Sequence, residues 1–415
     1  MKDNISYAEI KYIKRRLAPK IREIIGKFPA VVVTGARQVG KSTMLQNEFR
    51  EFAYLTMDDY DIVERARLDP RSLWREKDHI IIDEAQKVPG LFNAVKLTID
   101  SSPKKKRFIL SGSSNLLLME KNTESLAGRA IYFDLLPMTY GETMGNITPE
   151  NFLHLWDGKY IEKEQTVKET SPLPLMMRGF MPSLLGMKDH GDVLLWLEGY
   201  VKTYLERDLR EVSQIESLVD FRKVMQTLAL RTGNILNQAD VAKDSGISHP
   251  TTHRYIKLLE ISNIIQRVPG FFRSHGKRIV KSPKVYFVDP ALSIFLSGYL
   301  DEESLIRSRE VGGYFETMVF LHVRELCEMM KPRATIHYWR TTTGKEVDLV
   351  LEHGKKLLAL EVKITRDPTV HDIKNLLLFI DEYPETIRGV LVHTGKAIKW
   401  LHSKVIAVPW WWLDM

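Results

Sequence analysis

Short runs of consecutive apolar residues mark the first third of the sequence, separated by stretches whose apolar positions recur every three or four residues. The clearest run is Ala30–Thr34, whose β-branched and apolar side chains are typical of a strand buried on both faces. Four further runs have the same character: residues 54–57, 80–83, 108–111 and 130–135. Strands that alternate with helices in this way form a parallel sheet. The pattern therefore predicts a doubly wound α/β sheet that ends near Pro137.

The pattern changes three times after this sheet. Residues 141–230 predict mainly helices, and residues 194–209 have the clearest amphipathic spacing among them. Residues 231–300 predict short helices followed by a hairpin, whereas residues 310–415 return to mixed helices and strands. A chain of 415 residues also exceeds what one hydrophobic core usually organises. With residues 1–140 as the first region, the sequence predicts a multidomain α/β protein of four domains.

Charge and cysteine content bear on the protein's partners and on its cellular compartment. The formal net charge of +7 permits a polyanionic partner without requiring one. The single cysteine, Cys327, excludes an internal disulfide and fits a reducing compartment. The sequence has no apolar run as long as a membrane helix, and its charged N-terminus lacks the apolar core of a signal peptide. We expect a cytoplasmic protein that does not enter a membrane.

The loop after the first predicted strand has the spacing of a phosphate-binding loop. Residues 35–42 read G-x-x-x-x-G-K-S between a strand and a helix. Gly35 and Gly40 allow the tight turns that direct main-chain N–H groups at phosphates, and the helix N-terminus adds its dipole. Lys41 is expected to neutralise β- and γ-phosphate oxygens, and the Ser42 hydroxyl to bind Mg²⁺. The predicted cofactors are ATP and Mg²⁺, and the predicted nucleotide-binding residues are Gly35, Ala36, Arg37, Gln38, Val39, Gly40, Lys41, Ser42 and Thr43.

Two acidic residues, Asp83 and Glu84, follow the apolar run at 80–82 and predict the part of the site that binds metal and activates water. Asp83 is expected to hold the metal, and Glu84 to orient and deprotonate the attacking water. Solvated acids at the end of a strand are common by themselves, but the upstream phosphate-binding loop favours the functional interpretation. A small-molecule kinase shares such a loop. Glu84 favours water as the nucleophile instead, and with it ATP hydrolysis catalysed by Lys41 and Glu84.

Residues 237–260 have the pattern of a helix-turn-helix, with Gly246 at the turn. On the second helix, four positions with helical spacing are expected to face the core: Thr252, Tyr255, Ile256 and Leu259. Three polar residues are then expected to point outward: His253, Arg254 and Lys257. The following hairpin carries the basic residues Arg273, Lys277, Arg278, Lys281 and Lys284. A winged-helix domain that binds nucleic acid, with DNA favoured, fits this pattern. A module that docks proteins or only packs within the chain remains open.

The predicted elements after residue 312 follow the order α-β-β-β-α-β, which resembles the PD-(D/E)xK nuclease core. Glu361 and Lys363 are two residues apart in a strand and so share a face. Asp348 on the neighbouring strand is expected to meet Glu361, and the two carboxylates to bind Mg²⁺. Lys363 would stabilise the developing charge, and Glu316 could add a further acidic ligand. Alternatively, Glu361 and Lys363 form a satisfied pair within a scaffold that catalyses nothing.

Several motifs are similar to those of a large family of bacterial and archaeal AAA-plus ATPases. They are Gly-Ala-Arg-Gln-Val-Gly-Lys-Ser at 35–42, Asp-Glu-Ala-Gln at 83–86, Leu-Ser-Gly-Ser-Ser at 110–114 and Leu-Ala-Gly-Arg at 126–129. The resemblance implies that Ser113 lies in the nucleotide-sensing cluster after the fourth strand. It also implies that Arg129 is an arginine finger that reaches the γ-phosphate of a neighbouring subunit in a homo-oligomer. Arg178 and Arg207 are both open candidates for a second sensor.

Two functions from different classes follow from these features. The first is an ATP-driven enzyme that processes nucleic acid with the help of a nuclease at its C-terminus. The second is an ATP-gated switch, in which the nucleotide state controls binding to DNA or protein and nothing is cut.

Overall fold

The computed structural model describes residues 12–101, 106–112, 126–157, 170–208, 215–273 and 282–415, without the side chains of 205–208. The chain divides into two compact units. The first contains the residues up to Met138 together with Met181–Gly186 and Ile261–Ile264. The second contains Thr139–Phe180, Met187–Glu260 and Ile265–Met415.

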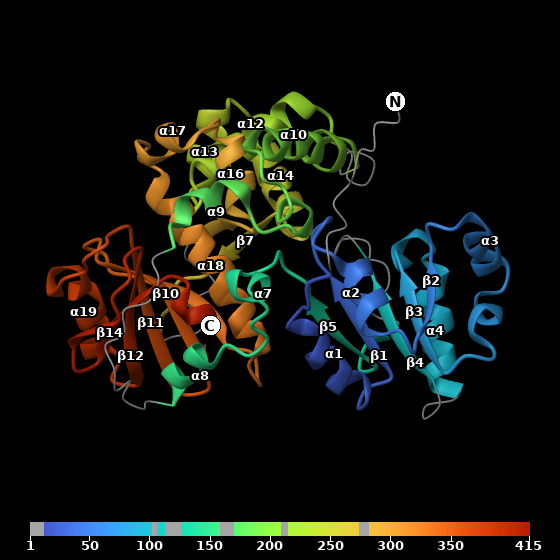
Figure 1. Cartoon of the computed structure of the whole chain (residues 1–415). Helices are drawn as coiled ribbons and strands as arrows, with labels where there is room; N and C mark the ends of the chain where they lie inside the picture. The colour runs from blue at the N-terminus through green and yellow to red at the C-terminus, as the bar shows by residue number, and fades with distance from the viewer. Residues whose placement is uncertain (1–11, 102–105, 113–125, 158–169, 209–214, 274–281) are drawn as a thin grey trace, which may run out of the picture. The chain divides into compact units, whose positions relative to one another are not determined.

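The first unit is built on a five-stranded sheet in the order β2-β3-β4-β1-β5, in which every neighbouring pair is parallel. The strands are β1 (Ala30–Thr34), β2 (Ala53–Thr56), β3 (His79–Asp83), β4 (Arg107–Ser111) and β5 (Ala130–Asp134). Each strand lies within or beside a predicted apolar run, so the predicted parallel α/β sheet is confirmed. Because β4 lies between β1 and β3, the loops that follow β1 and β3 emerge close together at one edge of the sheet (Figure 1).

Helices accompany this sheet, as the alternating pattern predicts. They are α1 (Leu17–Ile25), α2 (Lys41–Glu48), α3 (Tyr60–Leu68) and α4 (Gly90–Ser101), with short 3₁₀ turns at Pro70–Trp74 and Ala85–Lys87. Alternate residues of β3, such as Ile80 and Ile82, pack in a core that includes Trp74 and Phe92. All five residues of β1 are buried, which is why its sequence is apolar throughout rather than alternating.

The second unit contains a helical region with a small antiparallel sheet. Its helices are α9 (Pro172–Arg178), α10 (His190–Tyr200), α12 (Leu218–Ala229), α13 (Gln238–Ser245), α14 (His249–Ile261), α16 (Pro290–Leu296) and α17 (Glu302–Ile306). Five of these, α10, α12, α13, α14 and α16, form one group in Figure 1. The sheet has the order β6-β8-β7, with β6 (Asn234–Ile235), β7 (Ile265–Val268) and β8 (Lys284–Phe287). The helix predicted at 194–209 is instead α10 followed by a π-helix at Val201–Asp208.

A mixed six-stranded sheet in the order β13-β14-β12-β11-β10-β9 forms the rest of the second unit. Its strands are β9 (Thr335–Arg340), β10 (Glu346–His353), β11 (Lys356–Lys363), β12 (Thr386–His393), β13 (Lys399–His402) and β14 (Val405–Pro409), and its helices are α18 (Val311–Met329) and α19 (Lys374–Glu382). The order α18-β9-β10-β11-α19-β12 agrees with the predicted α-β-β-β-α-β order. The last two strands, β13 and β14, extend the sheet beyond what was predicted.

The helices α7 (Tyr140–Thr143) and α8 (Glu150–Trp156) pack on the C-terminal sheet region rather than on the helical one. The Gly141 N–H donates to the Asp414 carboxylate, and Lys356 Nζ donates to the Trp156 carbonyl at 3.1 Å. Sequence pattern alone could not assign these two helices, because these partners lie 200 or more residues away in the chain. Within the described ranges, each helix is too short or too polar to cross a bilayer.

Candidate nucleotide site and C-terminal acidic cluster

The predicted phosphate-binding loop connects the carboxyl end of β1 to the first turn of α2. Gly35 has φ of 144°, and a Cβ there would lie 2.2 Å from the Leu135 carbonyl oxygen, so only glycine fits. Gly40 and Gln38 also have positive φ, of 89° and 66°. Buried Arg15 donates to the Val39 carbonyl at 2.8 Å and to the Leu136 carbonyl at 2.6 Å. Sequence analysis did not identify Arg15, which holds the outside of the loop.

Lys41 lies across the inside of the loop. Its Nζ donates to the carbonyls of Gly35 at 3.0 Å and Ala36 at 2.8 Å, and only 6% of the residue is exposed. Burial lowers the pKa of Lys41 to about 8, although Glu84 and Asp83 act in the opposite direction. The ammonium group is therefore held beside the loop by two neutral acceptors, which it can exchange for phosphate oxygens.

Asp83 is buried at the carboxyl end of β3, on the far side of β4 from the loop. Its carboxylate accepts hydrogen bonds from Tyr54 of β2 and Ser111 of β4. Burial and the Asp83 carboxylate both raise the pKa of the Tyr54 phenol, which therefore stays a donor. Two donors on neighbouring strands thus fix the orientation of Asp83. Sequence analysis missed both roles, although Ser111 ends a strand at the same edge.

Glu84 follows Asp83 with a φ of 52°, in the left-handed region that is uncommon for residues other than glycine. This backbone conformation turns its side chain away from the strand, and Gln86 Nε2 donates to its Oε2 at 2.5 Å. Glu84 lines a cavity of about 460 Å³ together with Lys41, Ser42 and Thr43. The predicted water-activating acid and the phosphate-binding residues therefore share one cavity.

A smaller and more apolar hollow of about 270 Å³ adjoins this cavity. The two share Gly40, Thr43, Pro182 and Ser183, and the smaller one is also lined by Tyr12, Ile13 and Met138. A polar cavity beside an apolar hollow fits a molecule with a phosphate chain at one end and an aromatic base at the other.

The residues at this edge also fit a phosphate-bound Mg²⁺. Protein magnesium sites usually take one or two side-chain oxygens, with phosphates and water completing the octahedron. Ser42 lies in the first turn of α2, and the Asp83 carboxylate is fixed by two hydroxyl donors at the end of β3. Among the described residues, no group of three or more His, Cys, Asp or Glu side chains is arranged to hold a metal by itself.

Arg129 precedes β5 and lies at the amino ends of the strands, because Ala130 pairs with Ala30 at the start of β1. Its guanidinium forms two hydrogen bonds to the Asp100 carboxylate at the end of α4, of 2.6 and 3.0 Å. The phosphate-binding loop lies at the opposite edge of the same sheet. Arg129 therefore cannot serve the site of its own subunit, and its role toward a neighbouring subunit stays a prediction.

The other predicted sensor residues are Ser113, Arg178 and Arg207. Ser113 and the side chain of Arg207 lie outside the described residues. Arg178 is in the second unit, where its Nε donates to the Gly179 carbonyl at 3.3 Å and burial lowers its pKa.

The helix-turn-helix residues lie as predicted on α13 and α14. Asn237 caps α13, and Gly246 ends it with a left-handed φ of 71°. The four apolar-face residues of α14 are buried: Thr252, Tyr255, Ile256 and Leu259. The three outward residues are exposed: His253, Arg254 and Lys257. Arg254 is partly engaged, because it forms an ion pair of 3.0 Å with Glu216.

The predicted surface position of one basic hairpin residue, Lys284, is wrong. Lys284 was expected to be an exposed wing residue, but it is 1% exposed and surrounded by carboxylates in the second unit. Arg273 is exposed and lies over the Tyr383 ring, with its Nη2 2.9 Å from the Glu382 carbonyl. The central basic residues Lys277, Arg278 and Lys281 lie outside the described ranges.

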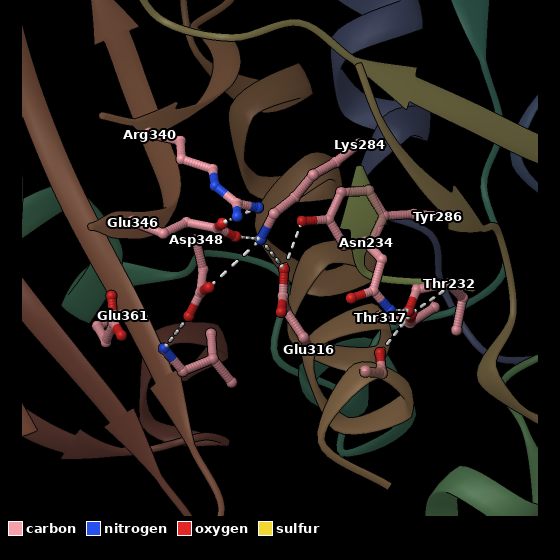
Figure 2. Close-up of polar contacts among 12 residues, drawn as sticks. Thr232, Asn234, Lys284, Tyr286, Glu316, Thr317, Arg340, Glu346, Asp348 and Glu361 are labelled. Carbon is pink, nitrogen blue, oxygen red and sulfur yellow. Dashed lines mark hydrogen bonds and ion pairs between the residues drawn. The ribbon is translucent and has the colours of Figure 1, made fainter. Parts of the chain in front are cut away.

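The C-terminal acidic residues gather around this same lysine (Figure 2). Lys284 Nζ lies 2.9 Å from Glu316 of α18, 2.6 Å from Glu346 and 3.3 Å from Asp348 of β10. The second oxygen of Asp348 accepts from the Val362 N–H of β11 at 2.9 Å. Asp348 therefore does reach the neighbouring strand, as the sequence predicts.

Glu361 and Lys363 form the close pair that their spacing predicts, with 2.7 Å between Oε1 and Nζ. The other Glu361 oxygen is buried without a hydrogen-bond partner, and burial and Asp348 raise the pKa of this carboxyl. Burial and Asp348 also raise the pKa of Glu316, to about 7. Burial opposes the charged form of Lys284, but the surrounding acids outweigh it and raise the pKa well above its ordinary value.

The predicted Mg²⁺ site at Asp348 and Glu361 does not fit this arrangement. The ammonium group of Lys284 already lies against the Asp348 carboxylate, and Glu361 is paired with Lys363. Sequence analysis could not foresee this, because it placed Lys284 in a different domain.

Comparisons with known proteins divide the chain into three segments. Residues 27–144 match the model of an AAA domain, whereas residues 173–303 and 311–413 match two domains of unknown function, DUF8612 and DUF4143. Residues 27–144 are therefore an AAA-type P-loop ATPase domain, which agrees with the geometry at the edge of the first sheet.

Curated relatives share most of the chain but are themselves uncharacterised. A Mycobacterium tuberculosis protein is 28% identical over 95% of this chain and 83% of its own length. A Methanocaldococcus jannaschii protein is 23% identical over 78% of this chain and 72% of its own. Among solved structures, a Walker-type ATPase of Pyrococcus abyssi aligns at 16% identity with a TM-score of 0.43, covering 67% of this chain and 94% of that one.

The lowered pKa of Lys41 predicts that ATP affinity depends on pH. Below pH 8 the ammonium form dominates and binds phosphate, whereas above about pH 8 the free protein must first protonate Lys41, so its affinity should fall by up to about tenfold per pH unit. Titration of the protein with a fluorescent ATP analogue between pH 6.5 and 9.5 measures this. In Lys41→Arg the guanidinium stays charged, so binding should be weaker but nearly flat with pH. Equal slopes in the two proteins would exclude Lys41 as the titrating group.

Proposed function

We propose that this protein is an ATP-hydrolysing switch that acts on nucleic acid. The observation that carries the hydrolytic part is the meeting of Lys41, Asp83 and Glu84 at one edge of the first sheet, beside a cavity of about 460 Å³. The AAA domain match over residues 27–144 supports the same conclusion.

In this proposal, the main-chain N–H groups of residues 35–42 bind the phosphates, and Lys41 moves its ammonium group from the Gly35 and Ala36 carbonyls to phosphate oxygens. Ser42 and Asp83 would hold Mg²⁺, which neutralises charge on the phosphates when it is bound. Glu84 accepts the proton of the attacking water, and Gln86 keeps its carboxylate in place. The apolar hollow beside Gly40 accommodates the base.

The order of elements in the helical region supports nucleic acid as the partner. The elements α12, β6, α13, α14, β7 and β8 follow the order helix-strand-helix-helix-strand-strand, with the three strands in one antiparallel sheet. This order is typical of winged-helix domains, in which the second helix of the helix-turn-helix enters the major groove. The corresponding helix here, α14, exposes His253, Arg254 and Lys257.

A homo-oligomer is part of this proposal. Because Arg129 lies at the amino edge of the sheet, it can stabilise phosphate charge only in the site of a second copy. It would first have to leave Asp100.

A nuclease is the second candidate function. Asp348 reaches β11, and Glu361 and Lys363 share one side of that strand, as a PD-(D/E)xK core requires. We favour the switch, because the ammonium group of Lys284 already takes contacts with Glu316 and Asp348 that a metal would use.

Glu84→Gln should separate ATP binding from ATP hydrolysis. The amide keeps the size and polarity of the side chain but cannot accept the proton of water, so turnover should fall by about 10²–10⁴-fold while ATP affinity stays within about threefold of the wild type. Phosphate release and calorimetric titration measure the two quantities. The control is Glu76→Gln, an exposed acid outside the cavity, which should leave both unchanged. A Glu84→Gln protein with wild-type turnover would show that the acid is misassigned.

Lys257→Gln should weaken DNA binding by removing one phosphate contact from α14. The slope of log affinity against log salt concentration should become less steep by about 1, as measured by fluorescence anisotropy with a labelled duplex. The control is Lys374→Gln, an exposed lysine on α19. In the Glu84→Gln background, DNA affinity should also differ between the ATP-bound, ADP-bound and nucleotide-free states. If all three states bind equally, the switch is refuted, and an unchanged salt slope removes α14 from the interface.

A further inference from the structure

We propose that Lys284 is the resident cation of the C-terminal acidic cluster and excludes Mg²⁺ and Mn²⁺ from it while β8 stays in place. The cluster is the set Glu316, Glu346, Asp348 and Glu361, which come from α18, β10 and β11 (Figure 2). The cation comes from β8, a strand of the small sheet in the helical region. The proposal concerns the nuclease-like site and does not depend on ATP hydrolysis.

The first support is that the ammonium group uses its full donor capacity within the cluster. An ammonium has three protons, and Lys284 Nζ lies 2.6, 2.9 and 3.3 Å from oxygens of Glu346, Glu316 and Asp348. The side chain is 2% exposed, so water does not compete for these contacts. A lysine that only neutralised a surface would not bury its head among three acids, since an unpaired buried charge is costly.

The second support is that two of these carboxylates also accept hydrogen bonds from further donors. The free oxygen of Asp348 accepts from Val362 N–H at 2.9 Å. Glu316 Oε1 accepts from the Tyr286 hydroxyl at 2.5 Å as well as from Lys284. Tyr286 lies on β8 two residues after Lys284, so one strand supplies both donors. A divalent cation would have to displace β8 side chains, and it would be repelled by the ammonium group before it did so.

The third support is that the backbone of β8 is fixed on both sides. Lys284 pairs with Ile235 of β6 and with Val268 of β7. Thr232 joins this sheet to α18, because its hydroxyl accepts from Phe287 N–H at 3.1 Å and lies 2.7 Å from the Thr317 hydroxyl. A Cβ on Gly313 of α18 would lie 2.5 Å from the Thr232 carbonyl oxygen, so the two elements are in close contact. The strand that carries Lys284 is therefore held on both sides, and Lys284 can leave the cluster only if the small sheet moves.

Glu361 shows where a metal would gain a ligand if the lysine left. One of its oxygens pairs with Lys363, and the other is buried without a hydrogen-bond partner. An oxygen of this kind is expensive to bury, which favours a cation whenever space for one exists. The cluster therefore supplies carboxylates of the kind that bind a divalent cation, and in this proposal Lys284 takes the place of that cation.

The test measures Mn²⁺ binding to the nucleotide-free full-length chain. The electron paramagnetic resonance signal of the free ion gives the amount that is bound. Each protein is compared with its own Asp348→Asn partner, so that Mn²⁺ held elsewhere, at Asp83 for example, cancels. The wild type and its Asp348→Asn partner should bind the same amount. The Lys284→Met protein should gain one Mn²⁺ site that is at least tenfold tighter than any Asp348-dependent binding in the wild type. This site should disappear when Lys284→Met is combined with Asp348→Asn. Lys404→Met, which removes an exposed lysine, should behave like the wild type.

Two results would overturn the proposal: Asp348-dependent Mn²⁺ binding in the wild type, or a folded Lys284→Met protein that gains no site. Removal of Lys284 leaves buried carboxylates without a counter-charge, so the variant could be unstable. MnCl₂ should then raise the unfolding temperature of Lys284→Met by several degrees more than that of Lys284→Arg, which keeps a positive charge at this position. Equal shifts would count against the proposal, and Asp348-dependent Mn²⁺ binding in the wild type would overturn it even if neither Lys284 variant folded. None of these outcomes bears on ATP binding, which uses residues of the first unit.

Discussion

The organisation of the first unit depends on one constraint: parallel strands place their carboxyl ends at the same edge of a sheet. Because β4 lies between β1 and β3, the phosphate-binding loop and Asp83 open on opposite sides of one strand end. Lys41 and Glu84 therefore line one cavity, and Asp83 is buried at the end of β3. The strand order alone brings these opposite charges together. Tyr54 and Ser111 then orient the Asp83 carboxylate, and Arg15 holds the phosphate-binding loop.

Much of this arrangement could be predicted from the sequence, because its signals are local. The apolar run Ala30–Thr34 and the glycine spacing at 35–42 locate a strand and a loop whose chemistry is fixed by backbone geometry. The α14 face follows from helical spacing, since Tyr255 and Ile256 are buried and Lys257 is exposed. The order of elements around β9–β12 was also predicted, because β10, β11 and β12 each contain an apolar run between turns.

The remaining features depend on contacts between residues far apart in the chain. Tyr54 and Ser111 acquire their roles only because their strands flank β3, which no spacing rule reveals. Lys284 was assigned to an exposed wing from the basic residues around it, yet its backbone lies between β6 and β7 and its side chain meets Glu316 of α18. Helix α8 packs against β11 and β12, and α7 contacts Asp414 after the last strand, for the same reason. A linear pattern states which residues are charged, whereas tertiary pairing decides whether a charge faces solvent or neutralises a buried acid.

The central claim is that the loop at 35–42 and the acid at the tip of β3 form a site for a magnesium-bound triphosphate. Isothermal titration of the purified chain with a non-hydrolysable ATP analogue, in magnesium buffer and in EDTA, tests it most directly. The account predicts one site per chain with micromolar affinity, at least about tenfold weaker when Mg²⁺ is removed and in Asp83→Asn. If the wild-type protein binds no adenine nucleotide in magnesium buffer, the account is contradicted.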